Sequence, residues 1–269
     1  MQVSFTKMNG AGNDFVMLDN RQGSLSLEIP QIAAFCDRHR GVGADGVLIV
    51  EPAQNGADFR MRYYNADGGE AEMCGNGARC FARFAQRVSG STKPGISFET
   101  QAGVISADFE GDLVRLIMSE PHSHIPPQNL DVDGRAMEVD FINTGVPHAV
   151  AFVSDVAAVN VFHDGAVLRH HQAFFPKGTN ANFVQVVRDG DLIIRTYERG
   201  VEDETLACGT GVCAAALLHH VRTGAASPVS VKVRGGDTLH VGFEKTADGF
   251  RNVTLTGPAD FVFEGIISI

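Results

Sequence analysis

Tryptophan is absent from this chain of 269 residues, and long apolar runs are absent too. No segment approaches the roughly 20 apolar residues that a membrane-spanning helix needs, so we expect no membrane attachment. Positive charge is scarce: 22 lysines and arginines stand against 32 acidic residues, and the net charge of −10 argues against nucleic acid as a partner. The first residues also lack the apolar core of a signal peptide, so we expect a cytoplasmic protein.

Cysteine is scarce as well, with five in the chain. An odd number in a reducing compartment argues against a disulfide framework. Two of the five nevertheless stand out, because each begins a Cys-Gly-x-Gly stretch that leads into a small, apolar helix. Cys74 begins the first stretch, and Cys208 begins the second, 134 positions later. This repetition at half the chain length indicates two equivalent halves.

Further landmarks repeat at nearly the same offset. The matched pairs are Gly10 with Gly145, Asn13 with His148, the segment 43–49 with 178–184, and the strand 59–65 with 193–199, which sets Asn65 opposite Arg199. Landmarks that keep one order and one offset are hard to obtain by chance, so we interpret the chain as an internal duplication. Alternating strand patterns dominate both halves, and a helix is also predicted over 30–38.

The expected fold class is α+β, with two pseudo-symmetric domains that each wrap a mixed, largely antiparallel sheet around a central helix. The helices after Cys74 and Cys208 are apolar around most of their circumference, with Val221 on the second apolar face, and such helices are usually buried. We expect an N-terminal domain over 1–118, joined by the last strand at 262–269, and a C-terminal domain over 119–261. The Pro-rich stretch 119–127 is the predicted junction.

A cysteine at such a helix start has properties that suit catalysis. The first N–H groups lack partners within the helix and, together with the positive helix end, attract an anion such as a carboxylate. The same field favours the thiolate and can lower the pKa of cysteine below its ordinary value of about 8.5. The alternatives are packing in the core, which we expect for Cys36, Cys80 and Cys213, and zinc binding. The Cys-x5-Cys and Cys-x4-Cys spacings, each interrupted by a helix, are not those of zinc sites.

Two equivalent thiols on opposite sides of one cleft suit a reaction whose substrate and product differ in configuration at one carbon. One thiolate would remove the α-proton from one face, while the opposite thiol delivers a proton to the other. Two helix ends would hold the carboxylate as negative charge develops. Because the sequence shows no nucleotide or metal signature, we predict an amino-acid racemase or epimerase that uses neither cofactor nor metal. A thiol redox or metal-binding protein is the alternative from a different class.

Six segments resemble the diaminopimelate epimerase family: MNGAGNDF at 8–15, GVGADG at 41–46, MCGNGARC at 73–80, GVPH at 145–148, YERG at 197–200 and ACGTG at 207–211. The resemblance runs from the first strand to the last helix. It implies a cytoplasmic homodimer that acts on a small molecule, interconverting LL- and meso-diaminopimelate on the bacterial route to lysine and peptidoglycan. It also implies that neither pyridoxal phosphate nor metal takes part.

The resemblance also implies roles for individual residues. The two acid/base thiols would be those of Cys74 and Cys208. The carboxylate at the reacting carbon would be held by four backbone amides, those of Gly75, Asn76, Gly209 and Thr210. The neighbours of the thiols and of the reacting amino group would be His148 and Glu198. The distal amino-acid end would be bound by Asn13, Asn65, Asn182 and Arg199, and a planar guanidinium suits a carboxylate there.

Two positions depart from the family pattern. Val146 stands where many members have Asn, and Gly46 stands where some have Gln. Both positions can line the pocket, so we expect its shape to differ there. A racemase of another amino acid, such as histidine or proline, is therefore the alternative on the same scaffold. The presence of Asn65, Asn182 and Arg199 together favours a substrate with a second amino-acid end.

Overall fold

The computed structural model describes residues 1–71 and 73–268, and the chain divides into two compact units. Unit 1 consists of Met1–Leu116 with Gly257–Ile269, and unit 2 consists of Ile117–Thr256. The domain limits expected from the sequence, 1–118 with 262–269 and 119–261, stay a prediction about folding units. Ile269, the last residue of the strand predicted over 262–269, lies outside the described residues, as does Glu72.

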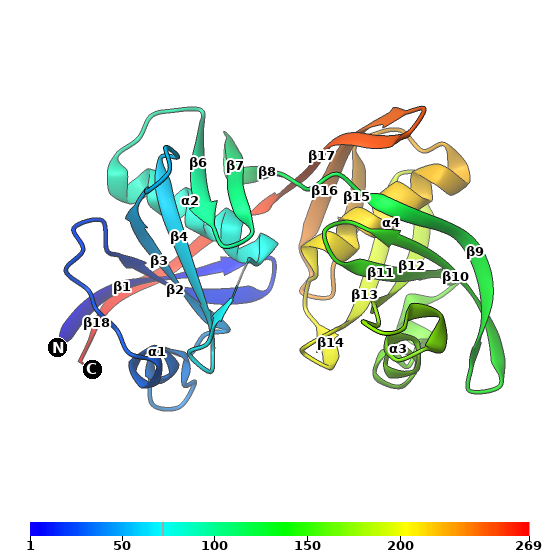
Figure 1. Cartoon of the computed structure of the whole chain (residues 1–269), viewed down its shortest axis with the longest axis horizontal. Helices are drawn as coiled ribbons and strands as arrows, with labels where there is room; N and C mark the ends of the chain where they lie inside the picture. Colours follow the sequence, from blue (N-terminus) through cyan, green and yellow to red (C-terminus); the bar gives the residue numbers. More distant parts are fainter. Residues whose placement is uncertain (72, 269) are drawn as a thin grey trace. The chain divides into compact units, whose positions relative to one another are not determined.

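In the described part of unit 1, strands form a sheet and two helices, α1 and α2, accompany it (Figure 1). Its elements are β1 (Gln2–Gly10), β2 (Asn13–Asp19), α1 (Ile29–Cys36), β3 (Gly46–Pro52), β4 (Phe59–Asn65), β5 (Glu70–Ala71), α2 (Gly75–Ser89), β6 (Gly95–Thr100), β7 (Gly103–Glu110), β8 (Leu113–Ile117) and β18 (Asp260–Ser268). The strand order is β18–β1–β2–β3–β4–β6–β7–β8, with β5 also paired to β4. The pairs β2–β3 and β4–β6 are parallel, and the others are antiparallel.

Unit 2 starts at Ile117, and most of the Pro-rich stretch 119–127 lies in its first strand rather than in a loop. Its elements are β9 (His122–Val132), β10 (Arg135–Asn143), β11 (Pro147–Phe152), η1 (Val156–Ala158), α3 (Val161–Arg169), η2 (Gln172–Phe174), β12 (Asn180–Arg188), β13 (Asp191–Glu198), β14 (Asp203–Thr205), α4 (Gly209–Thr223), β15 (Val229–Lys232), β16 (Thr238–Thr246) and β17 (Gly249–Pro258). The strand order is β9–β10–β11–β12–β13–β15–β16–β17, with β14 also paired to β13.

The two units share one topology. The parallel pairs β2–β3 and β4–β6 of unit 1 correspond to the parallel pairs β11–β12 and β13–β15 of unit 2. Every other pair in the two strand orders is antiparallel. The C-terminal strand β18 takes in unit 1 the edge position that β9 takes in unit 2. This repetition of order and direction confirms the predicted α+β fold with two pseudo-symmetric halves.

The central helices of the two units also begin and end alike. Both α2 and α4 have 15 residues, a cysteine as N-cap and a glycine in the left-handed conformation as C-cap. Strands of its own unit surround each helix (Figure 1). Two details differ from the sequence-based expectation: Val221 on α4 is 43% exposed, and α1 ends at Cys36 because Asp37 is already extended.

The outer helix α1 packs on the sheet of unit 1 and completes a second layer of the core. Ile32, Phe35 and Cys36 of α1 lie against Val16, Leu18 and Ile49 of the strands. In unit 2, Val161 and Leu168 of α3 pack in the same way against Phe183 and Tyr197. Each central helix is thus enclosed by a sheet, and an outer helix, α1 or α3, covers the other face of that sheet. This packing restrains the strands that carry the candidate site residues.

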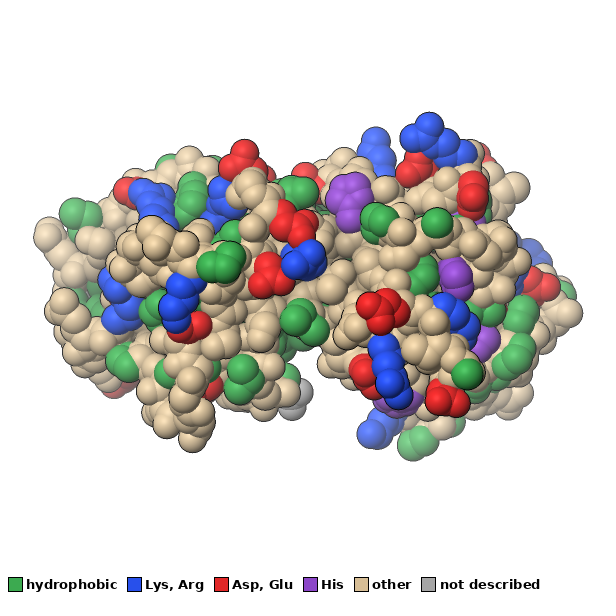
Figure 2. All heavy atoms as spheres, turned by 90° about the horizontal axis from the view of Figure 1, so that it is seen from above, with side chains coloured by type: hydrophobic (Ala, Val, Ile, Leu, Met, Phe, Trp, Pro, Cys, Tyr) green, Lys and Arg blue, Asp and Glu red, His purple; other side chains and the backbone are tan. Residues whose placement is uncertain are grey.

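The surface carries charges of both signs close together. Figure 2 shows acidic and basic side chains interspersed on the face that it draws. Several of these groups pair, as Arg62 does with Glu70 at 2.9 Å and Arg195 with Glu204 at 2.7 Å. Within residues 1–71 and 73–268, none of the helices is long and apolar enough to cross a membrane.

Candidate active site

Cys74 lies at the start of α2, in the position that the sequence predicts. Its backbone is extended, with φ −137° and ψ 123°, and its carbonyl accepts the first helical hydrogen bond from Ala78 N at 2.7 Å. The N–H groups of Gly75 and Asn76, in the first turn of the helix, therefore face the N-terminal end of α2. Gly77 allows the helix to approach the sheet, because a Cβ there would lie 3.2 Å from Leu48 Cδ1.

Cys208 takes the same position on α4. Its backbone is extended, with φ −120° and ψ 105°, and its carbonyl accepts from Val212 N at 2.9 Å. The residue is 6% exposed. Gly209 and Thr210 form the first turn, as Gly75 and Asn76 do in unit 1. Each unit therefore presents a thiol beside the N–H groups of a 15-residue helix, where the helix dipole favours a thiolate.

The other three cysteines are buried, as predicted. Cys36 is 5% exposed, and Cys80 and Cys213 are fully buried. Burial raises the pKa of Cys36 to about 11 and that of Cys80 to about 12, so both remain thiols at neutral pH. These side chains pack within their units.

In unit 1 a chain of hydrogen bonds crosses the start of α2. Arg79 Nη2 donates to Asn76 Oδ1 at 2.9 Å, Asn76 Nδ2 donates to Asn13 Oδ1 at 2.6 Å, and Asn13 Nδ2 donates to Asp45 Oδ2 at 2.9 Å. A guanidinium can only donate and a carboxylate can only accept, so the two ends fix the orientation of both amides between them. This chain positions Asn13 and Asn76, which the sequence nominated, through Arg79 and Asp45, which it did not.

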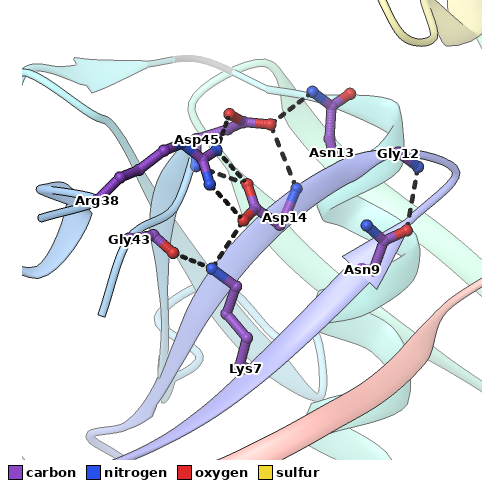
Figure 3. A network of polar contacts seen from close by, with 8 residues as sticks. All are labelled: Lys7, Asn9, Gly12, Asn13, Asp14, Arg38, Gly43 and Asp45. Carbon is purple, nitrogen blue, oxygen red and sulfur yellow. Dashed lines mark hydrogen bonds and ion pairs between the residues drawn. The ribbon is translucent and has the colours of Figure 1, made fainter. Parts of the chain in front are cut away.

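A cluster of ionic groups in turn holds Asp45 (Figure 3). Arg38 Nη2 lies 2.8 Å from Asp45 Oδ1 and 2.7 Å from Asp14 Oδ1, and Lys7 Nζ lies 2.7 Å from Asp14 Oδ2. The Lys7 ammonium also donates to the carbonyl of Gly43. Burial raises the pKa of Asp14, but hydrogen bonds from Arg38 and Lys7 outweigh it and lower that pKa to about 2. The network ties β1, β2 and the loop before β3 together beneath Asn13.

Unit 2 has a different set of side chains at the start of α4. His148 Nε2 lies 2.9 Å from Thr210 Oγ1, which lies 3.6 Å from Cys208 Sγ. On its other side, His148 Nδ1 lies 3.1 Å from Asn182 Nδ2. Predicted neighbours of the thiol thus come together, but Thr210 stands between His148 and the sulfur. The contact of His148 with Thr210 parallels that of Asn13 with Asn76 in unit 1.

His148 is fully buried. Burial and, after it, the positive charge of Arg199 lower the pKa of His148 to about 3, so the imidazole is neutral at physiological pH. Asn182, also fully buried, gives its two N–H groups to Ala149 O at 2.9 Å and to His148 Nδ1, and Thr196 Oγ1 donates to its Oδ1 at 3.0 Å. A direct contact between Asn182 and a substrate stays a prediction, because both of its N–H groups are used within unit 2.

Glu198 and Arg199 lie at the end of β13. Burial raises the pKa of Glu198, although a hydrogen bond from Thr205 Oγ1 at 2.9 Å partly offsets this. Arg199 N donates to Asn180 Oδ1 at 2.8 Å, and Asn180 Nδ2 donates to Pro147 O at 3.0 Å. Asn180 therefore links Arg199 to the turn that carries His148. The sequence did not nominate Asn180, although it lies two residues before Asn182, on the same strand face.

Asn65, at the end of β4, is exposed, and its backbone closes a turn with Gly68 and Gly69. Gly46 pairs with Asn65 across β3 and β4. A Cβ on Gly46 would lie 2.5 Å from Tyr64 O and 2.8 Å from Tyr63 Cε2. The departure from the family pattern at this position therefore fits a close approach of β4, which leaves no room for a larger side chain.

The sequence of this chain is similar to that of known proteins over nearly its whole length. A family model described as diaminopimelate epimerase matches residues 5–122 and 141–262. The diaminopimelate epimerase of Chlorobaculum tepidum is 44% identical over 269 residues, which cover 97% of this chain and 100% of that protein. That of Aquifex aeolicus is 42% identical over 277 residues, which cover 99% of this chain and 98% of that protein.

The chain belongs to the diaminopimelate epimerase family. Solved structures of other proteins share the fold of this chain. A phenazine biosynthesis protein of the PhzF family from Bacillus anthracis has a TM-score of 0.73 at 15% identity, with 100% of both chains covered. A hydroxyproline epimerase from Agrobacterium vitis has a TM-score of 0.69 at 18% identity, with 99% of this chain and 92% of that chain covered. At such identities the likeness shows a shared fold, and the family assignment depends on the closer relatives.

Proposed function

We propose that this chain interconverts LL- and meso-diaminopimelate, with Cys74 and Cys208 as its two acid/base groups. The observation that carries the proposal is the duplicated helix start: each cysteine is the N-cap of an equivalent 15-residue helix, in a chain of this family. Membership in the family supports the substrate. Burial raises the pKa of Cys36 and Cys80, and Cys213 lies inside α4, whereas Cys74 and Cys208 are the two cysteines at helix starts.

The proposed reaction moves one proton off and one proton onto the same carbon. The thiolate of one cysteine takes the α-hydrogen and becomes a thiol, and the electron pair left behind delocalises onto the substrate carboxylate. The thiol of the other cysteine then donates its proton to the opposite face and becomes the thiolate. No atom changes oxidation state, so these steps call for no cofactor. The reverse reaction exchanges the roles of Cys74 and Cys208.

The substrate carboxylate gains negative charge during the reaction. We propose that four backbone amides donate hydrogen bonds to it, those of Gly75, Asn76, Gly209 and Thr210. N–H groups in the first turn of a helix have no partner within the helix, and they carry the positive end of its dipole. They are fixed before the reaction, so little reorganisation is needed as charge develops. Each missing donor at such a site typically costs about 10²–10³ in kcat.

The remaining predicted residues are proposed to contact the rest of the substrate. Glu198, with its raised pKa, would lie near the reacting amino group, and Arg199 would bind the distal carboxylate with two parallel hydrogen bonds. Asn13 and Asn65 would bind the same distal end. Asn180 and Asp45 act through neighbours, by holding Arg199 and Asn13 in place.

We also propose that the protein is a homodimer in the cytoplasm. An apolar strip on unit 1 supports self-association: Val262, Phe263 and Ile266 of β18 are 56%, 49% and 67% exposed. Ile266 also lines a groove of about 560 Å³ formed by β1, β2, β18 and α2. Light scattering should give twice the chain mass for the parent and the single mass for Ile266→Glu. A parent of single mass would refute the dimer.

The test of the proposed activity is exchange of the α-proton in D₂O. We expect deuterium to enter LL- and meso-diaminopimelate, while histidine and hydroxyproline show no exchange. Cys74→Ala and Cys208→Ala should each abolish epimerisation while keeping the unfolding midpoint close to that of the parent. Cys36→Ala removes a thiol outside the proposed site and serves as the control, which should still turn over.

Two outcomes would overturn the proposal in different ways. Normal epimerisation by either Cys74→Ala or Cys208→Ala would refute the two-thiol mechanism. Exchange with histidine or hydroxyproline, and none with diaminopimelate, would instead refute the substrate. Purified protein that contains stoichiometric zinc bound to these cysteines would favour the metal-binding alternative.

A further inference from the structure

The hydrogen bonds at the start of α4 have a single direction, and the backbone carbonyl of Ala149 sets it. A carbonyl oxygen can only accept, so the Asn182 atom that lies 2.9 Å from it must be the amide nitrogen. The second N–H of that nitrogen is then directed at His148 Nδ1, 3.1 Å away. Thr196 Oγ1, at 3.0 Å, donates to the oxygen of the same amide, which agrees with this orientation.

The orientation of Asn182 fixes the tautomer of His148. Because Nδ1 accepts a hydrogen bond, it carries no proton, and in the neutral imidazole the proton is on Nε2. Nε2 lies 2.9 Å from Thr210 Oγ1 and therefore donates to it. The hydroxyl oxygen of Thr210 is thus an acceptor from His148, and its own hydrogen is available for another acceptor. Cys208 Sγ, at 3.6 Å, is within reach of that hydrogen.

We propose that Asn182, His148 and Thr210 form a directed array that points the Thr210 hydroxyl hydrogen at Cys208 Sγ and so stabilises the thiolate of Cys208. This deepens the proposed function and depends on it, because it assigns a resting form to one of the two proposed acid/base groups. In this array His148 is a neutral donor and does not take the proton of Cys208. Asn182 is a positioning residue: it bonds His148, which in turn bonds the Thr210 hydroxyl that contacts the sulfur.

Unit 1 shows why the array is specific to Cys208. At the matching positions, Asn13 and Asn76 are both amides, and charged groups fix the direction of their chain at its two ends. A hydroxyl can rotate about its C–O bond and redirect its hydrogen, whereas the N–H groups of an amide are fixed in the amide plane. The duplicated halves therefore place a rotatable hydroxyl donor two residues after Cys208 and a fixed amide two residues after Cys74.

Two charged residues near the array, Glu198 at the end of β13 and Arg199 directly after it, bear on the test. Arg199 carries a positive charge that acts on His148, and Glu198 accepts a hydrogen bond from Thr205. Both stay unchanged in every variant below, so a change in the thiolate population of Cys208 can be assigned to the array.

The first test measures the tautomer of His148 in the full chain. The ¹⁵N shifts of the imidazole at pH 7, assigned by the signal that disappears in His148→Gln, should show a neutral ring with the proton on Nε2. A proton on Nδ1, or an imidazolium, would overturn the array. Asn182→Leu removes the donor to Nδ1, and we expect a mixture of tautomers. If Asn182→Leu keeps the pure Nε2–H form, Asn182 does not position the ring.

The second test measures the thiolate itself. The rate at which iodoacetamide alkylates Cys208, followed by peptide mass spectrometry from pH 5 to 10, reports its thiolate fraction. Thr210→Val removes the hydroxyl and keeps the backbone N–H. We expect it to slow alkylation at pH 7 about tenfold, which corresponds to about 1.4 kcal/mol. Thr210→Ser should stay within about twofold of the parent, because it keeps the donor.

Thr223→Val is the matched control on the same helix. The Thr223 hydroxyl donates to His219 O at 2.8 Å, at the far end of α4, and its loss should leave alkylation of Cys208 unchanged. An unchanged rate in Thr210→Val, or an equal slowing in Thr223→Val, would refute the proposal. Neither readout needs turnover. If the protein shows the expected tautomer and alkylation rates but exchanges no α-proton, the proposed function is refuted and the array is still supported.

Discussion

Replacing Asp14 by asparagine should destabilise unit 1 through the loss of one charge. The Asp14 carboxylate lies 2.7 Å from Lys7 Nζ and accepts two hydrogen bonds from Arg38, at 2.7 and 3.0 Å. The side chains of Lys7 and Asp14 are 7% and 17% exposed, so water screens this pair weakly. Asparagine has nearly the same shape, and the Asp14→Asn variant therefore tests the charge rather than the packing.

The pKa of Asp14 gives the magnitude. Burial raises it, but the bonds from Arg38 and Lys7 outweigh burial and lower it from 3.8 to about 2. At about 1.4 kcal/mol for each pKa unit, the charged form contributes about 2 kcal/mol to the free energy of unfolding at pH 7. Because the folded-state pKa lies below the unfolded value, this contribution is complete above pH 3.8 and is lost as the pH falls through about 2.

Urea unfolding of the parent and of Asp14→Asn at pH 7 and pH 3 checks this prediction. We expect a loss of about 2 kcal/mol at pH 7 that falls to about half at pH 3. Asp19→Asn breaks an ion pair with Arg21 whose two side chains are 35% and 33% exposed, and should cost less than about 1 kcal/mol. A loss for Asp14→Asn no larger than this control, or one that does not shrink at pH 3, would refute the reasoning.

Two further predictions concern the candidate site, and a third concerns a helix end outside it. Gly211→Ala places a Cβ 2.5 Å from Asn182 Oδ1, so we expect a loss of about 1–3 kcal/mol in urea unfolding together with a lower kcat; full activity would contradict the close packing. Gly90→Ala, at a helix end with nothing within 4 Å, should lose stability but keep its kcat. Arg199→Lys keeps the charge but loses the planar fork, so KM for diaminopimelate should rise about tenfold or more, as steady-state assays would show; an unchanged KM would exclude a two-point contact.

The sequence by itself determined the repetition and the place of its two cysteines at helix starts. Cys74 and Cys208 each precede a Gly-x-Gly stretch, and glycine at those positions allows a helix to start close against a sheet. Local patterns of this kind depend on neighbouring residues, so they can be read along the chain. The strands, the two central helices and the pseudo-symmetric α+β fold follow from the same local patterns.

Tertiary structure alone decided which side chains contact Asn13 and His148. Asp45 reaches Asn13 across 32 positions, and Asn182 reaches His148 across 34, and both contacts depend on how parallel strands align. Neither alternation nor spacing specifies that alignment, because a shift of one residue would turn each side chain to the other face of its sheet. The direction of the hydrogen bonds at Cys208 was likewise decided in three dimensions, by the carbonyl of Ala149.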